Sequence, residues 1–211
     1  MSPSVVLIGA SAVAGAGYAF LLERSPSALR TAVKTLAVAA LAALAYLRDA
    51  PTGLVVALVL SAVGDAFLAG DPKRWLPAGL GSFLVAHIAY VWLFLEDGGG
   101  RAALAAEPVR AAGVIMAFAA GVMMLAWLWR SLGALRPAVV VYALALSAMV
   151  AAAFTLPKFL MPAMAGAVMF MASDAILSAE LFKQLRSRLS SQAVWWLYYA
   201  AQASIAYAYL R

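Results

Sequence analysis

The sequence predicts an all-α polytopic membrane protein, a bundle of eight transmembrane helices that forms one transmembrane domain over residues 1–211. Of these residues, 66% are hydrophobic and only 11% are charged, and the mean hydropathy is +0.95. These values lie far outside the range of soluble globular domains. Apolar runs of about 20 residues, the length that crosses a bilayer, fill nearly the whole chain and leave no room for a soluble domain.

Short breaks that carry charges, glycine or proline separate the apolar runs. They read ERSPS, RDAP, GDPKR, EDGGGRAALAAEP, RSLGALRP, TLPK and KQLRSRLSS, and such residues are typical of loops at a membrane surface. The predicted helices cover residues 4–22, 29–47, 52–69, 75–95, 108–129, 137–156, 160–182 and 192–210. The first run is too long for the apolar region of a signal peptide and follows no basic residue, so we interpret it as a retained helix. At TLPKFLMP, a single bent or re-entrant element is the alternative to two helices.

The basic residues predict how the helices cross the membrane. The first, third, fifth and seventh loops, with the adjoining helix ends, carry nine Lys and Arg residues, against five on the other side. By the positive-inside rule, the odd-numbered loops face the cytoplasm and both termini lie outside, in a bacterial cytoplasmic membrane. Aromatic residues near helix ends are expected to anchor the protein at the interfaces; they are Trp75, Trp127, Trp129, Trp195, Trp196 and Tyr209.

The composition also excludes several classes of function. The net charge of +6 is spread singly or in small groups beside apolar runs, so we expect no nucleic-acid partner. The chain has no cysteine and a single histidine, His87. Disulfides, thiolate metal sites and cysteine nucleophiles are therefore excluded. A zinc hydrolase would gather several histidines with a carboxylate, so we expect neither a metal nor another cofactor.

Two similar segments place aspartates inside apolar helices. SAVGDAFLAG contains Asp65 and MASDAILSAE contains Asp174, on the third and seventh predicted helices, which cross the membrane in the same direction. This pairing suits a parallel four-plus-four repeat, and chance similarity in an alanine-rich chain is the alternative. An ionisable residue inside a span costs about 2.5–3.5 kcal/mol and so marks function by default. A structural ion pair or hydrogen bond between helices is the alternative for each aspartate.

Further polar residues lie at comparable depths. With a rise of 1.5 Å per residue, Lys34, Asp65, His87, Asp174 and Gln202 lie about 6–18 Å from the surface formed by the odd-numbered loops. Five polar groups in one half of the bilayer indicate a cavity open to one leaflet. Residues at helical spacing from this set are Ser61, Tyr90, Ser178, Tyr198 and Tyr199. For Lys34, snorkelling to the head groups is the alternative; for Gln202 and the tyrosines it is interhelical hydrogen bonding.

Four segments carry a resemblance to a known family. They are SAVGDAFLA, GSFLVAHIAYVWLF, AGAVMFMASDAILSAELF and LYYAAQASIAY, in this order along most of the chain. Their G-D-x-x-L, A-H-x-x-Y and S-D-x-x-L patterns are specific in combination. With them the chain resembles the YhhN family of membrane lysoplasmalogenases. It departs from the family pattern after Lys34, where the family often has proline and this chain has Thr35.

The resemblance implies an intramembrane ether hydrolase. Its substrate is a lysophospholipid, lysoplasmalogen, whose vinyl ether it cleaves to a fatty aldehyde and a glycerophospho-alcohol bearing choline or ethanolamine. Vinyl ether hydrolysis needs an acid that protonates the alkene carbon and an anion near the resulting cation, and two carboxylates supply both, as in glycosidases. We therefore predict that Asp65 and Asp174 form an acid and base pair, with His87 relaying protons or positioning water. The predicted substrate contacts are Lys34 and Arg30 for the phosphate, with Tyr90, Tyr198, Tyr199 and Gln202.

A proton-coupled membrane transporter is the alternative function, because intramembrane aspartates and a histidine also form proton relays. Apart from Gly64, neither aspartate has a glycine or proline beside it that would break its helix. This argues against the broken helices that many transporters use. A lipid-binding or structural membrane protein without catalysis is a third possibility.

Overall fold

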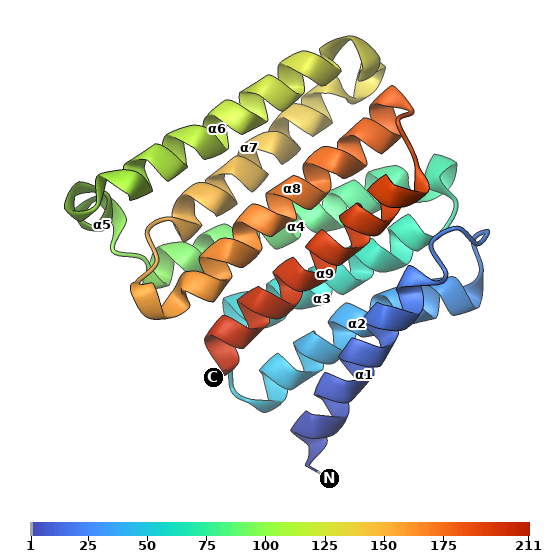
Figure 1. Ribbon diagram of the computed structural model, residues 1–211, viewed down its shortest axis with the longest axis horizontal. Coiled ribbons are helices and arrows are strands. Elements are labelled where there is room, and N and C mark those ends of the chain that lie inside the picture. Colours follow the sequence, from blue (N-terminus) through green and yellow to red (C-terminus); the bar gives the residue numbers. More distant parts are fainter. Residues whose placement is uncertain (1) are drawn as a thin grey trace. The chain divides into compact units, whose positions relative to one another are not determined.

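The structure is a computed structural model that describes residues 2–211, apart from the side chains of residues 72 and 73. Lys73, one of the basic residues counted for the third loop, therefore lies outside the described side chains. The described chain consists of helices joined by short loops and contains no strands. Short 3-10 turns occur at Trp129–Ser131, Gly133–Leu135 and Lys158–Leu160. Its α-helices are α1 (Pro3–Ala19), α2 (Ala28–Leu47), α3 (Thr52–Ala69), α4 (Pro72–Asp97), α5 (Gly100–Ala106), α6 (Pro108–Leu128), α7 (Arg136–Ala153), α8 (Met161–Lys183) and α9 (Arg188–Leu210) (Figure 1).

A helix lies over each of the eight predicted segments, and six helical segments are long and apolar enough to cross a membrane. These six are Ala28–Leu47, Thr52–Ala69, Arg74–Asp97, Pro108–Ser131, Gly133–Ala153 and Lys158–Lys183. Of the other two, α1 has only 17 residues, and α9, rich in Trp and Tyr, is less apolar. Length and composition are thus those of an integral membrane protein.

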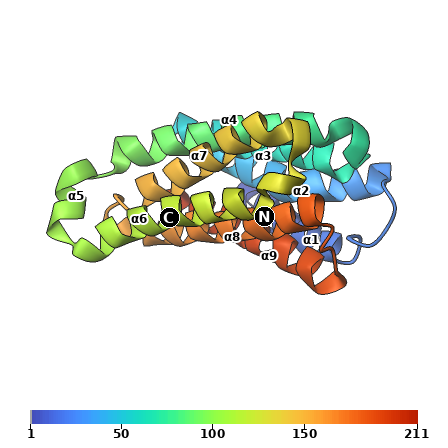
Figure 2. The same cartoon turned by 90° about the horizontal axis from the view of Figure 1, so that it is seen from above.

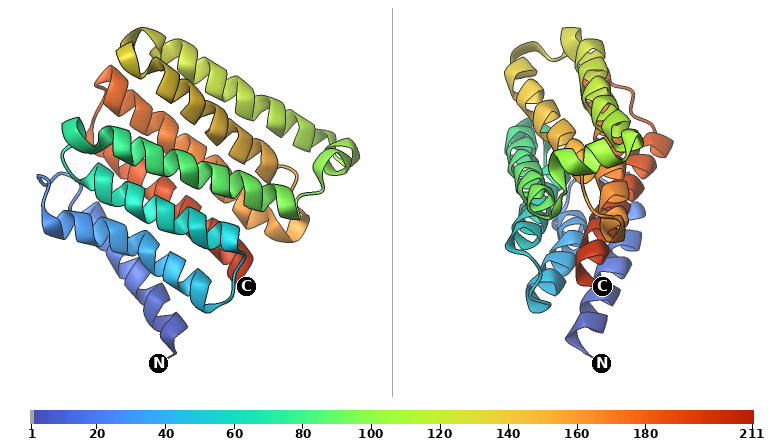
Figure 3. Two further views of the ribbon diagram at one scale, coloured as in Figure 1. Left: turned by 180° about the vertical axis from the view of Figure 1, so that it is seen from behind. Right: turned by 90° about the vertical axis from the view of Figure 1, so that its left-hand side faces the viewer.

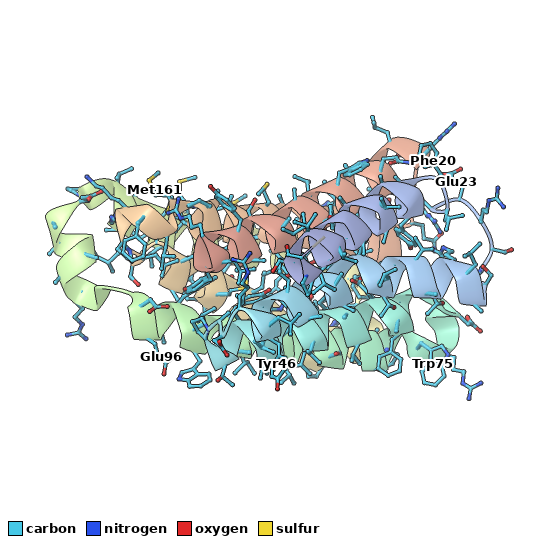
Figure 4. The ribbon with its side chains drawn as sticks, turned by 90° about the horizontal axis from the view of Figure 1, so that it is seen from below. Phe20, Glu23, Tyr46, Trp75, Glu96 and Met161 are labelled. Atoms are coloured by element: carbon cyan, nitrogen blue, oxygen red, sulfur yellow. The ribbon has the colours of Figure 1, made fainter. Side chains whose placement is uncertain are left out.

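The helices form two compact units, and α4 contributes to both. Unit 1 comprises residues 1–89 with 209–211, and unit 2 comprises residues 90–208. In unit 1, α2 packs against both α1 and α3, and Figure 3 shows α2 and α3 side by side and antiparallel. Its 20–27 and 70–71 loops lie at the same end, where Figure 4 labels Glu23 and Trp75. We refer to this end as the loop end of unit 1.

Small residues allow α3 and α4 to approach closely. A Cβ atom at Gly64 would lie 2.6 Å from the ring of Phe83, and one at Gly79 would lie 2.5 Å from the side chain of Leu68. Close helix contact through glycine is a common means of packing in membranes. These two contacts also fix the register, because residues 64 and 68 of α3 face residues 83 and 79 of the antiparallel α4.

Unit 2 contains two antiparallel helix pairs. The α6–α7 contact includes a hydrogen bond from Ser147 Oγ to the Ala117 carbonyl at 3.3 Å. In the α8–α9 contact, a Cβ atom at Gly166 would lie 2.8 Å from the Ala201 carbonyl oxygen. The chain from α7 to α8 reverses through the turn at residues 154–160 (Figure 1). The alternative of a single bent element over TLPKFLMP is therefore wrong.

An additional short helix, α5, lies inside the loop predicted at EDGGGRAALAAEP and joins α4 to α6 (Figure 2). The loop is held to the α7–α8 turn by a hydrogen bond from the Gly99 amide to the Thr155 carbonyl at 2.9 Å. Arg110 Nη1 donates to the carbonyls of Phe154, at 3.1 Å, and Leu156, at 2.5 Å. The fourth and sixth predicted loops therefore share one end of unit 2.

Candidate functional site

Asp65 forms a buried ion pair with Lys34. Lys34 Nζ lies 3.0 Å from Asp65 Oδ1, and the two side chains are 12% and 1% exposed. The antiparallel register of α2 and α3 produces this contact, since one turn closer to the loop end Arg30 Nη1 donates to the Ala69 carbonyl at 2.8 Å. The ammonium compensates a carboxylate that would be costly to bury alone. The structural ion pair that was the alternative interpretation of Asp65 is thus formed. Its partner is Lys34, the residue predicted from the sequence to contact the substrate phosphate.

The ring of Tyr18, on α1, covers both cations of this cluster. Lys34 Nζ and the Arg30 guanidinium carbon each lie 5.7 Å from the ring centroid, and Tyr18 is buried. The electron-rich ring face stabilises cations at this distance. Tyr18 is not among the site residues predicted from the sequence, although it lies about 6 Å from the end of the first predicted helix, a depth close to that of Asp65.

Three polar atoms around the ion pair have no hydrogen-bond partner within the described part of the chain. They are Arg30 Nε, Thr35 Oγ1 and Ser61 Oγ, and all three are buried. Because a buried polar group without a partner costs free energy, such atoms indicate a place where water or another ligand binds. Unit 1 therefore contains charged, hydrogen-bonded and unsatisfied polar groups within a short stretch of α2 and α3.

His87 lies deeper in unit 1 than Asp65. It is fully buried on α4, and the contact of Gly64 with Phe83 places position 87 level with position 60 of α3. Along the helix axis this is about 8 Å farther from the loop end than Asp65. The structure therefore brings these residues into one unit, with Arg30 nearest the loop end, Lys34 and Asp65 level with each other, and His87 deepest.

Asp174 has a neutral partner. Tyr142, on α7, donates a hydrogen bond from Oη to Asp174 Oδ2 at 2.6 Å, and Asp174 is half-buried on α8. Tyr142 is not among the site residues predicted from the sequence, because an uncharged side chain carries no large burial cost. Its depth is a usable signal, because it lies about 8 Å from the start of the predicted helix 137–156.

The two aspartate partners occupy equivalent positions. Lys34 follows the first residue of α2 by six residues, and Tyr142 follows the first residue of α7 by six. Lys34 precedes Asp65 by 31 residues, and Tyr142 precedes Asp174 by 32. In each case the partner comes from the helix immediately before the aspartate helix. A four-plus-four repeat would produce this correspondence, and the repeat stays a prediction.

Gln202 and the tyrosines serve helix packing in unit 2. Tyr90 Oη donates to Gln202 Oε1 at 2.5 Å, and both residues are fully buried. The ring of Tyr198 packs edge-on against Phe170 at 5.3 Å, and that of Tyr199 stacks on Trp195 at 5.9 Å. The interhelical hydrogen bond considered for Tyr90 and Gln202 is thus formed. Whether these residues also contact substrate stays a prediction.

A charged cluster outside the apolar segments lies at the end of unit 2 that the fourth and sixth predicted loops share. Glu107 accepts from Arg110 Nε at 3.1 Å, and Lys158 Nζ lies 3.8 Å from its second oxygen. The hydrogen bond from Arg110, with the charges of Arg110 and Lys158, lowers the pKa of Glu107 below its usual value of 4.5. In the described residues, no three His, Asp or Glu side chains gather in a group that could hold a metal ion.

A buried and a half-buried carboxylate, each with an interhelical partner inside an apolar helix, define a polytopic membrane protein with intramembrane polar sites. The chain belongs to the YhhN family, whose model matches residues 29–209. Relatives from Mycobacterium bovis and Mycobacterium tuberculosis, both named lysoplasmalogenase, are each 37% identical to it over 157 residues. This match covers 72% of the chain and 58% of each relative, so the chain spans a little over half the length of these curated relatives. No solved structure matches it.

Proposed function

We propose that this protein is an intramembrane hydrolase that cleaves the vinyl ether of lysoplasmalogen. The products would be a fatty aldehyde and glycerophosphocholine or glycerophosphoethanolamine. The names of the relatives support the reaction. The observation that carries the proposal is that each intramembrane aspartate has a polar partner from the preceding helix, Lys34 for Asp65 and Tyr142 for Asp174.

In the proposed mechanism, Asp174 is the acid. Its carboxyl group gives a proton to the distal alkene carbon, the π electrons form the new C–H bond, and the carbon bound to the ether oxygen becomes part of an oxocarbenium ion. A tyrosine hydroxyl can hydrogen-bond to a carboxyl group in either protonation state. The partner Tyr142 is therefore compatible with an aspartate that is protonated before the reaction and ionised after proton transfer.

Asp65 is the proposed base. The Lys34 ammonium stabilises its ionised form, because a positive charge 3.0 Å from Oδ1 favours the charged carboxylate. The carboxylate would stabilise the oxocarbenium ion and accept a proton from water as the water oxygen bonds to the cationic carbon. The hemiacetal then loses its C–O bond to glycerol: Asp65 returns its proton to the glycerol oxygen, and the hemiacetal hydroxyl proton passes to the Asp174 carboxylate. This releases the aldehyde and restores both carboxyl groups.

The remaining predicted residues have supporting roles in this proposal. Arg30 and Lys34 lie nearest the loop end of unit 1, where a phosphate at the membrane surface would meet them. His87 would relay protons at a deeper level. Tyr90, Tyr198, Tyr199 and Gln202 would line the path of the apolar chain. We further propose that all eight long helices cross a bacterial cytoplasmic membrane as one domain, with the odd-numbered loops in the cytoplasm and both termini outside.

The test is aldehyde release from lysoplasmalogen by purified wild-type protein and by Asp65→Asn and Asp174→Asn variants. Each substitution should lower the rate about 10²–10⁴-fold, the usual contribution of a general acid or base. Asp97→Asn, which changes an exposed aspartate at the end of α4, is the control and should retain the wild-type rate. Wild-type rates in both site variants would end the proposal. Proton-dependent solute uptake in liposomes without hydrolysis would favour the transporter.

A further inference from the structure

We propose that Ser61, together with Asp65, binds the attacking water, which is the second substrate of the hydrolysis. The inference rests on the proposed function and adds a binding site for the nucleophile. Ser61 is fully buried on α3, and its Oγ makes no hydrogen bond within residues 2–211, leaving aside the two undescribed side chains. A hydroxyl in this position retains both its donor and its acceptor capacity.

Other buried or partly buried serines of the chain show what a structural hydroxyl does. Ser147 donates to the Ala117 carbonyl, Ser173 to that of Val194 and Ser178 to that of Ala175. The buried Ser191 donates to the Glu180 carboxylate at 3.0 Å. In unit 1, the buried Ser11 likewise donates to Ala37 at 2.6 Å. Serines in apolar helices commonly satisfy the hydroxyl in this way. The Ser61 hydroxyl does not, so a partner outside the protein is needed to satisfy it.

The geometry of α3 points to water as that partner. Ser61 and Asp65 are four residues apart, so their Cβ atoms are about 5–6 Å apart on the same helix face. This spacing lets one water molecule hydrogen-bond to both side chains. Thr35 Oγ1, the other unsatisfied hydroxyl of the cluster, is level with position 64 in the α2–α3 register, between Ser61 and Asp65. A buried water normally has two to four polar partners, and this place offers them.

The site fits the chemistry that Asp65 is proposed to perform. As the water oxygen forms its bond to the oxocarbenium carbon, one of its protons passes to the Asp65 carboxylate, and that proton later reaches the departing glycerol oxygen. The hydrogen bond with Ser61 holds the water so that a lone pair of the water oxygen points at the oxocarbenium carbon. The Lys34 ammonium keeps the acceptor carboxylate ionised until the proton arrives.

The experiment is a partition assay with methanol as a competing nucleophile. Capture of the oxocarbenium ion by water gives the aldehyde, whereas capture by methanol gives a stable mixed acetal, and mass spectrometry measures the ratio. Ser61→Ala should raise the ratio of acetal to aldehyde several-fold and lower kcat about tenfold, the size of one lost hydrogen bond, with KM unchanged. Ser61→Thr keeps the hydroxyl and should restore the ratio.

The matched control is Ser11→Ala, which removes a buried hydroxyl from the same unit and should leave the partition ratio at the wild-type value. A merely structural role for Ser61 would lower the amount of active protein without moving the ratio, so an unchanged ratio in Ser61→Ala overturns the inference.

A second measurement does not depend on hydrolysis. An experimental structure that resolves water should show one within hydrogen-bond distance of both Ser61 Oγ and Asp65. A Ser61 hydroxyl bonded to a protein carbonyl, with no water there, overturns the inference. If wild-type protein does not hydrolyse lysoplasmalogen, the proposed function fails, and this measurement still decides whether the water site exists.

Discussion

Asp65 and Asp174 lie in similar sequences, yet the structure gives them partners of different charge. Asp65 is fully buried beside the Lys34 ammonium, whereas Asp174 is half-buried and accepts a hydrogen bond from the Tyr142 hydroxyl. Both partners stand at the same place in the preceding helix. The difference teaches that the helix arrangement fixes where an aspartate finds its partner, and the residue type at that place decides which charge state is stabilised.

The largest expected effect comes from removing the charged partner. Lys34→Met keeps most of the apolar stem but leaves the Asp65 carboxylate buried without its cation, which should lower the free energy of unfolding by about 3–5 kcal/mol. Denaturant titration in detergent measures it. The double variant Lys34→Met with Asp65→Asn removes both charges and should recover most of the loss. A double variant as unstable as the single one would contradict the interpretation of Lys34 as a charge partner.

The packing of the two aspartate-bearing helices, α3 and α8, should respond unequally to alanine. At Gly166 a Cβ atom would meet the Ala201 carbonyl oxygen at 2.8 Å, a backbone atom that cannot rotate away. At Gly64 it would meet the Phe83 ring, a side chain. Gly166→Ala should cost about 1–3 kcal/mol, as overpacked cores do, and Gly64→Ala should cost less. Thermal unfolding of the two variants checks the order, and the opposite order would show that the α8–α9 contact adapts more easily.

Removing the neutral partner should have a smaller effect than removing the cation. Tyr142→Phe deletes the hydrogen bond to Asp174 and leaves the ring, so the aldehyde-release rate should fall about tenfold, with little change in KM. Tyr46→Phe, at an exposed position of α2, is the control and should keep the wild-type rate. Equal rates for Tyr142→Phe and wild type would remove Tyr142 from the proposed mechanism.

The smallest effect is expected at the ion pairs of Glu107, a partly exposed carboxylate that contrasts with the buried Asp65. The pKa of Glu107 is lowered in the folded state. The ionised Glu107 therefore contributes fully to the free energy of unfolding at a pH above 4.5, the usual pKa of glutamate. This contribution is lost as the pH falls through the lower pKa of the folded state. The Tm of wild type should fall slightly more than that of Glu107→Gln as the pH is lowered below 4.5. High salt should remove the difference, because exposed ion pairs are screened.

The eight long helices were predictable because each apolar run is bounded by charges, glycine or proline. The short helix α5 was not, because the glycines of EDGGGRAALAAEP indicate a loop while its AALAA run is too short to be recognised. The Lys34–Asp65 pair could have been predicted from the sequence, because the estimated depths of these residues on consecutive antiparallel helices differ by only about 2 Å.

Helix rotation was not predictable. Trp195 and Trp196 are neighbours that sequence reasoning assigned to the same interface, and the structure exposes Trp196 by 44% but Trp195 by only 2%. Adjacent residues of a helix point about 100° apart, and hydropathy alone does not say which of two tryptophans faces the neighbouring helices. Tyr142, the partner of Asp174, was not predicted for a different reason: an uncharged tyrosine carries no burial cost large enough to mark it as a site residue.

The short α2–α3 connection has a consequence for how the chain enters the bilayer during synthesis. Only residues 48–51 join the two helices, and their antiparallel register brings the Lys34 ammonium against the Asp65 carboxylate. Inserted separately, each helix would carry an isolated charge at a cost of about 2.5–3.5 kcal/mol. Inserted together as a hairpin, they carry an electrically neutral pair, so the biogenesis of this region favours simultaneous over sequential entry of α2 and α3.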